Sequence, residues 1–207
     1  MYTLYYSPGA ASVAVHGLLE ELGVSYQTEL IDTANNEHQG AAYLKLNPTG
    51  KIPAMRLETG EVISESAALC LFLADRHPQG GMSPAFDDPK RGPFLQWLMY
   101  LTNTLQPADL RFYYSDRYTS AAGDLDAIKE AAQTEIATCW KRIDTHLAAH
   151  GPYLLGDRYS AADVFCYMLS TWQDSTPGLY ERYPHVKKLA DLVSARPAIQ
   201  RMIQASA

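Results

Sequence analysis

A carboxylate, a hydroxyl and unpaired backbone N–H groups come together at Glu65 and Ser66, at the predicted start of a helix over residues 66–77. A helix N-terminus of this kind is an anion site. About a dozen residues earlier, Ile52-Pro53 precedes a short apolar strand. Because proline cannot donate to a ladder, this pair predicts a tight turn before an edge strand, and a cis X-Pro bond is expected there. A strand that can pair with an extended peptide, beside a carboxylate pocket, indicates a receptor for a small acidic peptide.

Taken together, Ile52-Pro53 and Glu65-Ser66 resemble the cytosolic glutathione transferases, and most closely the bacterial beta class. The resemblance extends over the whole chain. It implies that the backbone of Ile52 pairs with the cysteinyl part of glutathione and that Glu65 and Ser66 hold its γ-glutamyl end. It also implies that Lys51 reaches the glycyl carboxylate. A solvated turn lysine and simple helix capping by Glu65 and Ser66 are the structural alternatives.

Activation of the glutathione thiol is the chemical task that the resemblance implies. A free thiol with a pKa of about 8.5–9 is mostly protonated at neutral pH, whereas the thiolate is the nucleophile. Lowering that pKa by about 2 units requires about 2.7 kcal/mol. A hydroxyl that donates to the sulfur supplies about 1.5–3 kcal/mol, and a helix N-terminus adds about 0.3–1 kcal/mol. Ser12, a predicted N-cap after the first turn, offers both.

The first turn departs from the beta-class pattern. That class usually has Pro-Gly-Ala-Cys-Ser, whereas residues 8–12 read Pro-Gly-Ala-Ala-Ser, so Ala11 replaces the family's cysteine. A mixed disulfide with glutathione at this position is therefore excluded, and non-covalent activation by Ser12 becomes the leading hypothesis. Tyr6, which has the spacing of the tyrosine-type classes, is the rival. Activation by backbone N–H groups and the helix dipole alone is the third possibility.

The electrophile pocket is expected on the first long helix after residue 90. Aligned by Trp97-Leu98, the beta class has Asn and a His-Lys pair where this chain has Met99, Gln106 and Pro107. Pro107 is expected to end or kink the helix. Helical spacing would place Met99, Asn103 and Gln106 on one face, bordering the pocket. The aromatic run that includes Tyr113 could form its floor or pack inside the helical domain.

The order of predicted elements in the first third of the chain, βαβ-α-ββα, is that of a thioredoxin-like α/β domain. An all-α domain follows, because apolar residues then recur at steps of 3 and 4. We expect a thioredoxin-like glutathione-binding domain over residues 1–78, a Gly- and Pro-rich linker over 79–89, and an all-helical domain over 90–207 that forms the electrophile pocket. Ser160 and Asp163 form a predicted capping box, interpreted as structural.

Composition limits the other functions. The net charge is −6, which argues against nucleic acid and anionic membranes as partners. Three cysteines, Cys70, Cys139 and Cys166, are far apart and predict buried thiols, with neither a metal site nor a disulfide framework. No apolar run is long enough to span a membrane and the first residues lack the features of a signal peptide, so a cytoplasmic protein is expected.

The resemblance therefore implies a homodimeric glutathione transferase that uses glutathione as co-substrate and no metal, and attacks small hydrophobic electrophiles in a detoxification role. Two alternatives stay open. One is a glutathione-dependent isomerase or dehalogenase of a small acid, which would need a further cationic anchor, with Arg111 as the obvious residue. The other is a non-catalytic glutathione- or ligand-binding protein of the same fold.

Overall fold

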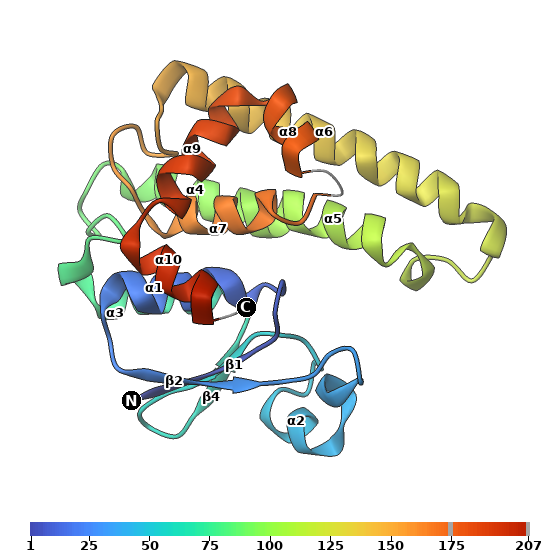
Figure 1. The fold of residues 1–207 in the computed structure, drawn as a ribbon, viewed down its shortest axis with the longest axis horizontal. Coiled ribbons are helices and arrows are strands. Elements are labelled where there is room, and N and C mark those ends of the chain that lie inside the picture. Colours follow the sequence, from blue (N-terminus) through green and yellow to red (C-terminus); the bar gives the residue numbers. More distant parts are fainter. Residues whose placement is uncertain (174–175, 206–207) are drawn as a thin grey trace. The chain divides into compact units, whose positions relative to one another are not determined.

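The computed structural model describes residues 1–173 and 176–205, which form two compact units (Figure 1). The first unit comprises residues 1–86 together with 193–207, and the second comprises residues 87–192. A four-stranded sheet lies in the first unit, whereas the second is helical. The predicted α/β domain followed by helices is confirmed. The predicted boundaries at residues 78 and 90 stay a prediction.

The sheet of the first unit is mixed, with the strand order β2-β1-β3-β4. Strand β1 pairs parallel with β2 and antiparallel with β3, which pairs antiparallel with β4. The strands are β1 (Tyr2–Tyr6), β2 (Tyr26–Leu30), β3 (Ala54–Arg56) and β4 (Val62–Ser64).

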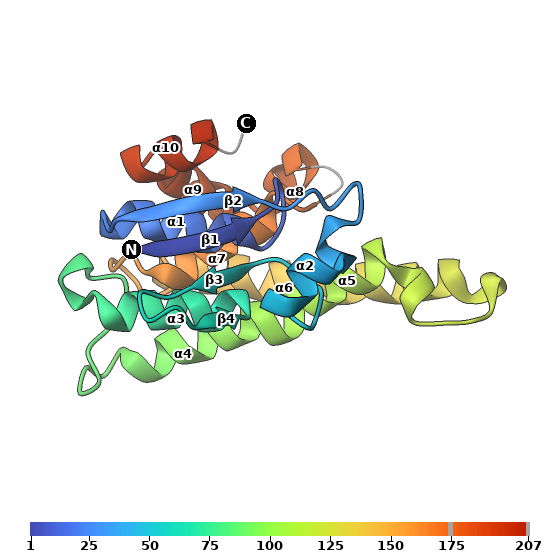
Figure 2. The ribbon, with the colours of Figure 1, turned by 90° about the horizontal axis from the view of Figure 1, so that it is seen from below.

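Helices cover both faces of this sheet (Figure 2). On one face Tyr5 packs with Tyr43 of α2 and with Ala54. On the other face lies α1, because the ring of Tyr6 contacts His16. The helices of this unit are α1 (Ser12–Leu22), α2 (Ala41–Leu46), α3 (Ser66–Arg76) and α10 (Pro197–Ala205), with short 3₁₀ turns at Glu37–Gln39 and Pro78–Gly80.

The last helix of the chain belongs to the first unit, because α10 packs against α1. Two arginines join them: Arg196 Nε lies 2.5 Å from a carboxylate oxygen of Glu21, and Arg201 Nε lies 2.6 Å from one of Glu20. Sequence periodicity placed this helix within the predicted all-helical domain over 90–207 and gave no sign of its partner.

The expectation that Pro53 leads into an edge strand is wrong. Strand β3 lies between β1 and β4, so it is central. Pro53 precedes β3, so its lack of an N–H group removes no hydrogen bond from the sheet. The Ile52–Pro53 bond is cis, as expected, and Gly151–Pro152 is a second cis bond.

The helical unit contains one long continuous helical segment before its first loop. Its parts are α4 (Arg91–Tyr100), a π-helical turn (Leu101–Leu105) and α5 (Gln106–Tyr113). Figure 2 shows that α4 and α5 run on from one another. The remaining helices are α6 (Leu125–His150), α7 (Ala161–Ser170), α8 (Thr176–Arg182) and α9 (Pro184–Ser194), with 3₁₀ turns at Ser115–Arg117 and Ala122–Asp124.

Of the two outcomes expected at Pro107, an end or a kink of the helix, the structure rules out the end. Pro107 occupies the second position of α5, directly after the π turn. A π turn contains an extra residue per turn and commonly marks a functional segment. It also changes the phase of the helix, so the 3–4 spacing on which Met99, Asn103 and Gln106 were predicted to share one face does not hold across it.

The capping box of the helical unit and the three buried thiols of the chain match the sequence predictions. Asp163, fully buried, accepts hydrogen bonds from Ser160 N–H (2.8 Å), Ser160 Oγ (2.9 Å) and Leu154 N–H (2.8 Å), which completes the predicted capping box. Burial raises the pKa of the Asp163 carboxyl to about 7. The predicted burial of Cys70, Cys139 and Cys166 is confirmed, and burial raises the pKa of the Cys70 thiol to about 12.

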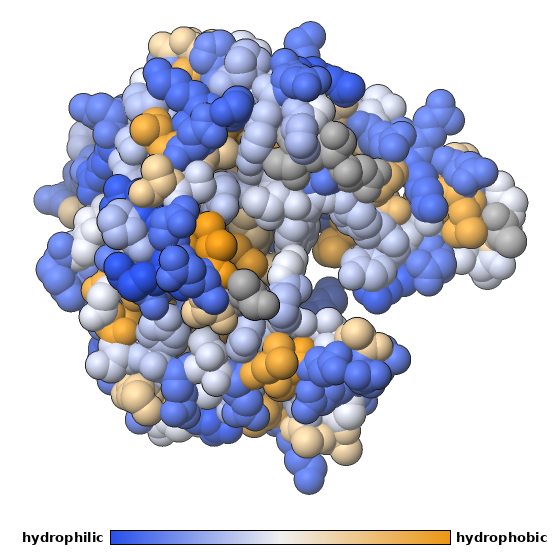
Figure 3. All heavy atoms as spheres, in the orientation of Figure 1, coloured by the Kyte–Doolittle hydropathy of each residue, from blue (hydrophilic) through white to orange (hydrophobic). Residues whose placement is uncertain are grey.

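The face of the protein seen in Figure 3 is predominantly polar. In the view of Figure 3, hydrophilic side chains cover most of each unit, and apolar side chains form small separate patches. Phe86 is the most exposed of the large apolar residues described, at 82%. Within residues 1–173 and 176–205 no helix combines the length and the apolar character that a membrane span requires.

Candidate functional site

Three segments of the first unit meet at one end of its sheet. In the antiparallel register, Ala54 of β3 stands opposite both Ser64 of β4 and Tyr5 of β1. The residues just before Ala54 therefore lie at the same end as those that follow Ser64 and Tyr5. This register brings together Ile52-Pro53, Glu65-Ser66 and the turn after Tyr6. The predicted glutathione-binding residues thus gather in one place, from three separate parts of the sequence.

Side chains hydrogen-bond to the backbone carbonyl groups of the loop before Pro53. Lys51 C=O accepts hydrogen bonds from Tyr43 Oη and Asn47 Nδ2, each at 2.7 Å. Gln39 Nε2 donates to Gly50 C=O at 2.9 Å. Gly50 has φ +60, and a Cβ there would lie 2.6 Å from the Gln39 side chain, so this position requires glycine.

Ile52, in contrast, has a free backbone. Among the described residues neither its N–H nor its C=O has a hydrogen-bond partner. An unpaired donor and acceptor on one residue, next to a central strand, can pair with the backbone of an extended peptide. The sequence placed this capacity along an edge strand, whereas the structure places it in the loop before β3.

Glu65 and Ser66 form a helix start with unusual backbone geometry, in which Glu65 is exposed and Ser66 is buried. Glu65 has φ +71, one of two non-glycine residues with positive φ in the described chain. Such a conformation costs about 1–3 kcal/mol and is typical of ligand-binding positions. The first intrahelical bond of α3 runs from Leu69 N–H to Glu65 C=O, so the N–H groups of residues 66–68 precede it. The Ser66 hydroxyl makes no hydrogen bond to any other described residue.

Ser12 lies at the start of α1, one position after its N-cap, which is Ala11. The Ser12 side chain is 1% exposed and is bonded within its own turn. Its Oγ donates to Ser7 C=O at 3.0 Å and accepts from Ser7 N–H at 3.3 Å. The Ser12 hydroxyl thus closes the turn of residues 7–12, and it could donate to a thiolate only by leaving Ser7 C=O.

Tyr6 and Tyr5, at the end of β1, face opposite sides of the sheet. Tyr5 is core, 2% exposed, and its Oη accepts a hydrogen bond from Arg56 Nη2 at 2.9 Å. Tyr6 is half-buried, and its ring contacts His16. Among the described residues the Tyr6 hydroxyl has no hydrogen-bond partner. The two candidates for activating the thiol therefore differ. The hydroxyl of Ser12 already donates its proton to Ser7 C=O, whereas the hydroxyl of Tyr6 donates to no other described residue.

Comparison with known proteins decides the family. Residues 10–76 match the model of the glutathione S-transferase N-terminal domain, and residues 102–206 match that of the glutathione S-transferase C-terminal domain. The chain belongs to the glutathione S-transferase family. Glutathione S-transferase GST-4.5 of Xanthomonas campestris pv. campestris is 26% identical over 169 residues, which cover 82% of this chain and 81% of that protein.

Solved structures agree with this membership. A glutathione transferase homologue from Sulfitobacter, with bound glutathione, superposes with a TM-score of 0.90 at 27% identity, over 99% of this chain and 98% of that one. A bacterial beta-class glutathione S-transferase from Sphingomonas chungbukensis superposes with a TM-score of 0.85 at 25% identity, over 99% and 98% of the two chains.

The residues predicted for the electrophile pocket of this glutathione S-transferase lie along one helical segment. Met99 of α4 is 38% exposed, and Asn103 lies exposed in the π turn. Gln106 begins α5 and accepts a hydrogen bond from Thr102 Oγ1 at 3.2 Å. Tyr113 ends α5, and its hydroxyl donates to Trp172 C=O. Arg111 is ion-paired with Glu135, so it is poorly suited to bind the small acidic substrate of the isomerase or dehalogenase alternative.

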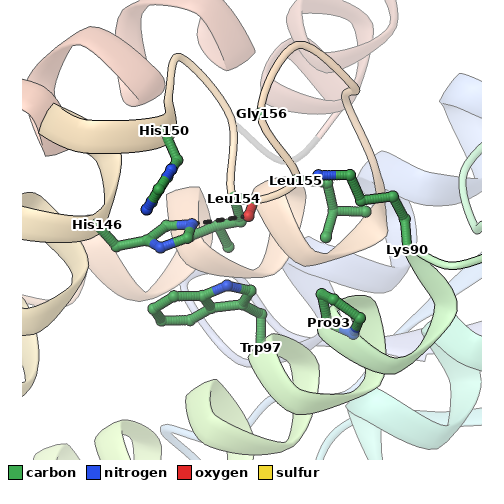
Figure 4. A pocket seen from close by; sticks show the side chains of 8 residues that line it. All are labelled: Lys90, Pro93, Trp97, His146, His150, Leu154, Leu155 and Gly156. Atoms are coloured by element: carbon green, nitrogen blue, oxygen red, sulfur yellow. Dashed lines mark hydrogen bonds between the residues drawn. The ribbon is translucent and has the colours of Figure 1, made fainter.

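A cavity of about 290 Å³ in the helical unit lies beside the loop that follows α6 (Figure 4). Trp97 of α4 forms one wall, and the His146 ring lies 4.5 Å from it, centroid to centroid. His146 Nε2 is 2.9 Å from Leu154 C=O, which can only accept, so this nitrogen carries the proton. Burial lowers the pKa of His146, with further lowering by His150. His146 therefore has a structural role, because its neutral imidazole holds the loop that contains Leu154.

The residues that position the binding loop were missed by sequence reasoning. Tyr43, Asn47 and Gln39 hold the carbonyl groups of Lys51 and Gly50. Only Asn47 gave a local signal, because it begins an Asn-Pro-x-Gly turn in which its Oδ1 accepts from Thr49 N–H at 3.2 Å. Lys51 itself is exposed, and its side chain has no partner among the described residues, which leaves it available to a ligand.

Proposed function

We propose that this glutathione S-transferase binds glutathione in its first unit and activates the thiol for attack on small hydrophobic electrophiles. One observation carries the proposal: the free backbone of Ile52 and the free hydroxyl of Ser66 lie at the same end of the sheet. A tripeptide with a carboxylate at one end can use both at once. We assign the cysteinyl backbone to Ile52, beside Pro53, and the γ-glutamyl end to Glu65 and Ser66. The glycyl carboxylate is assigned to Lys51.

Thiol activation is proposed to involve no protein thiol. Ala11 has a methyl group where the beta class has cysteine, and the three cysteines of the chain are buried elsewhere. In the proposed mechanism, Ser12 Oγ–H leaves Ser7 C=O and donates to the glutathione sulfur. The exchange is favoured because a hydrogen bond to an anion is about twice as strong as one to a neutral carbonyl. The N-terminus of α1 adds its dipole.

We expect the purified protein to consume glutathione with at least one class of electrophile, measured spectrophotometrically with aryl halides, epoxides and organic peroxides. The thiolate is the attacking group, so the rate should rise with pH up to the pKa of bound glutathione. A maleyl acid tests the isomerase alternative, which the Arg111–Glu135 ion pair makes less favourable. Binding of glutathione with no turnover of any of these compounds would support a binding protein and contradict the proposed reaction.

We further propose a cytoplasmic homodimer. A closed twofold dimer buries the same surface of both copies. In each copy, residues 1–78 are proposed to bind glutathione and residues 90–207 to bind the electrophile. Light scattering at micromolar concentration should give twice the 23.0 kDa mass of one chain. A mass equal to one chain at that concentration would rule the dimer out.

A further inference from the structure

The cavity beside the loop that follows α6 is not explained by the proposed function. It lies within the helical unit, and its volume of about 290 Å³ is close to the lower end of the range for small-molecule sites. Among the described residues that line it, none is assigned to glutathione or predicted for the electrophile pocket. Its walls come from the start of α4, the end of α6 and the loop between α6 and α7.

Two side chains of α4 offer unpaired donors to this cavity. Lys90, at the N-cap of α4, is exposed, and its Nζ has neither a hydrogen bond nor an ion pair among the described residues. The neighbouring Asp88 carboxylate accepts instead from Lys90 N–H at 2.8 Å and pairs with Arg158 Nη1 at 2.6 Å. Trp97 Nε1–H also has no partner in the described chain, but unlike the indole nitrogens of the other two tryptophans it is not fully buried. It is therefore open to a ligand.

These two donors lie on the same face of α4. Lys90 and Trp97 are seven residues apart, which is about two helical turns, and the Trp97 side chain leans towards the N-terminus of the helix, where Lys90 lies. Figure 4 shows both side chains at the cavity, together with Pro93 from the turn between them. Leu154 and Leu155 complete the apolar part of the wall.

The charge around the cavity favours an anion. Its lining includes no carboxylate among the described residues. The pKa of His146, in the cavity wall, is sensitive to the local charges. Burial lowers this pKa most, and His150, Arg142 and Lys90 lower it further, whereas no acidic residue of the described chain raises it. A cation would meet the same three basic side chains.

A carboxylate on an apolar ring matches these groups. Its two oxygens only accept, so they suit a lysine ammonium and an indole N–H. An inorganic anion would leave the apolar walls without a partner. We propose that this cavity binds a small aromatic carboxylate, whose oxygens accept hydrogen bonds from Lys90 Nζ and Trp97 Nε1–H while its ring packs on Pro93, Leu154 and Leu155. The site is independent of glutathione.

The test uses the full chain without glutathione at pH 7, where benzoate is ionised. NMR titrations compare benzoate with benzamide, which has the same ring and no charge, with acetate, which has no ring, and with inorganic phosphate. Benzoate should bind about tenfold or more tightly than each of these, because only benzoate combines the charge with the apolar ring. Benzoate should also shift the indole N–H signal of Trp97, one of three tryptophans in the chain.

A substitution tests the assigned cation. Lys90→Met removes the charge and keeps a long side chain, so it should weaken benzoate binding about tenfold and leave benzamide binding unchanged. Lys129→Met, at another exposed lysine of this unit, is the matched control and should change neither. Binding of benzamide, acetate or phosphate as tight as that of benzoate would overturn the proposal. An unmoved Trp97 signal, unchanged benzoate affinity in Lys90→Met, or no binding of benzoate would also overturn it.

Discussion

Replacing Ser66 by alanine should weaken the binding of glutathione about 10- to 100-fold. The proposed bond from the Ser66 hydroxyl to the γ-glutamyl carboxylate is charge-assisted, and loss of such a bond costs about 1.5–3 kcal/mol. The effect on the fold should be small, because this hydroxyl makes no hydrogen bond to another described residue. Calorimetry with the wild-type protein and the variant measures the difference directly.

Two further variants separate the carboxylate pocket from general effects. Glu65→Ala should also weaken binding, because it removes a negative charge proposed to face the glutathione ammonium group. Ser25→Ala, an exposed serine in the same unit, should leave the affinity unchanged. Unchanged affinity in both Ser66→Ala and Glu65→Ala, or no binding by the wild-type protein, would show that the assigned site is wrong.

The parts of this site that sequence could predict are those set by short-range chemistry. Ile52-Pro53 and Glu65-Ser66 each form a local unit, a turn and a helix start, and both have the predicted geometry. The expectation that the strand after Pro53 is an edge strand was wrong, because a proline shows only that its own N–H is missing and not which strands lie on either side. Pairing between distant segments decides whether a strand is central.

Some hydrogen-bond partners in both units, and some of the burial in the helical unit, were beyond sequence reasoning for the same reason. Ser12 was predicted as an N-cap whose hydroxyl donates to the glutathione sulfur, yet the turn places Ser7 C=O 3.0 Å from Ser12 Oγ, which donates to it. Pro107 was expected to end or kink its helix, and the structure shows that the helix continues through Pro107, directly after a π turn. Asp109 and Trp140 look like ordinary helix residues in the sequence, and only the packing of α5 against α6 reveals that Asp109 Oδ2 and Trp140 Nε1–H are buried without a hydrogen-bond partner.

Ser12→Ala should reduce turnover at neutral pH about 10- to 100-fold and raise the apparent pKa of bound glutathione. In the wild-type protein this pKa should lie about 2 units below that of the free thiol, because a hydroxyl that donates to the sulfur favours the thiolate. Removing the hydroxyl removes about 1.5–3 kcal/mol of that preference. The pH profile of turnover measures both quantities. Ser12→Thr, which keeps a hydroxyl, should restore most of the activity.

The pH profile also separates catalysis from folding. Ser12→Ala removes the hydrogen bonds that its hydroxyl makes with Ser7, so it should lower stability as well, but a purely structural role would leave the pKa of bound glutathione unchanged. Tyr6→Phe should have a much smaller effect on turnover. Ala11→Cys should allow a mixed disulfide with glutathione, visible by intact mass, that the natural chain cannot form at this position. Full activity of Ser12→Ala together with inactivity of Tyr6→Phe would instead assign thiol activation to the free Tyr6 hydroxyl, whereas full activity of both would leave the N-terminus of α1 as the activating group.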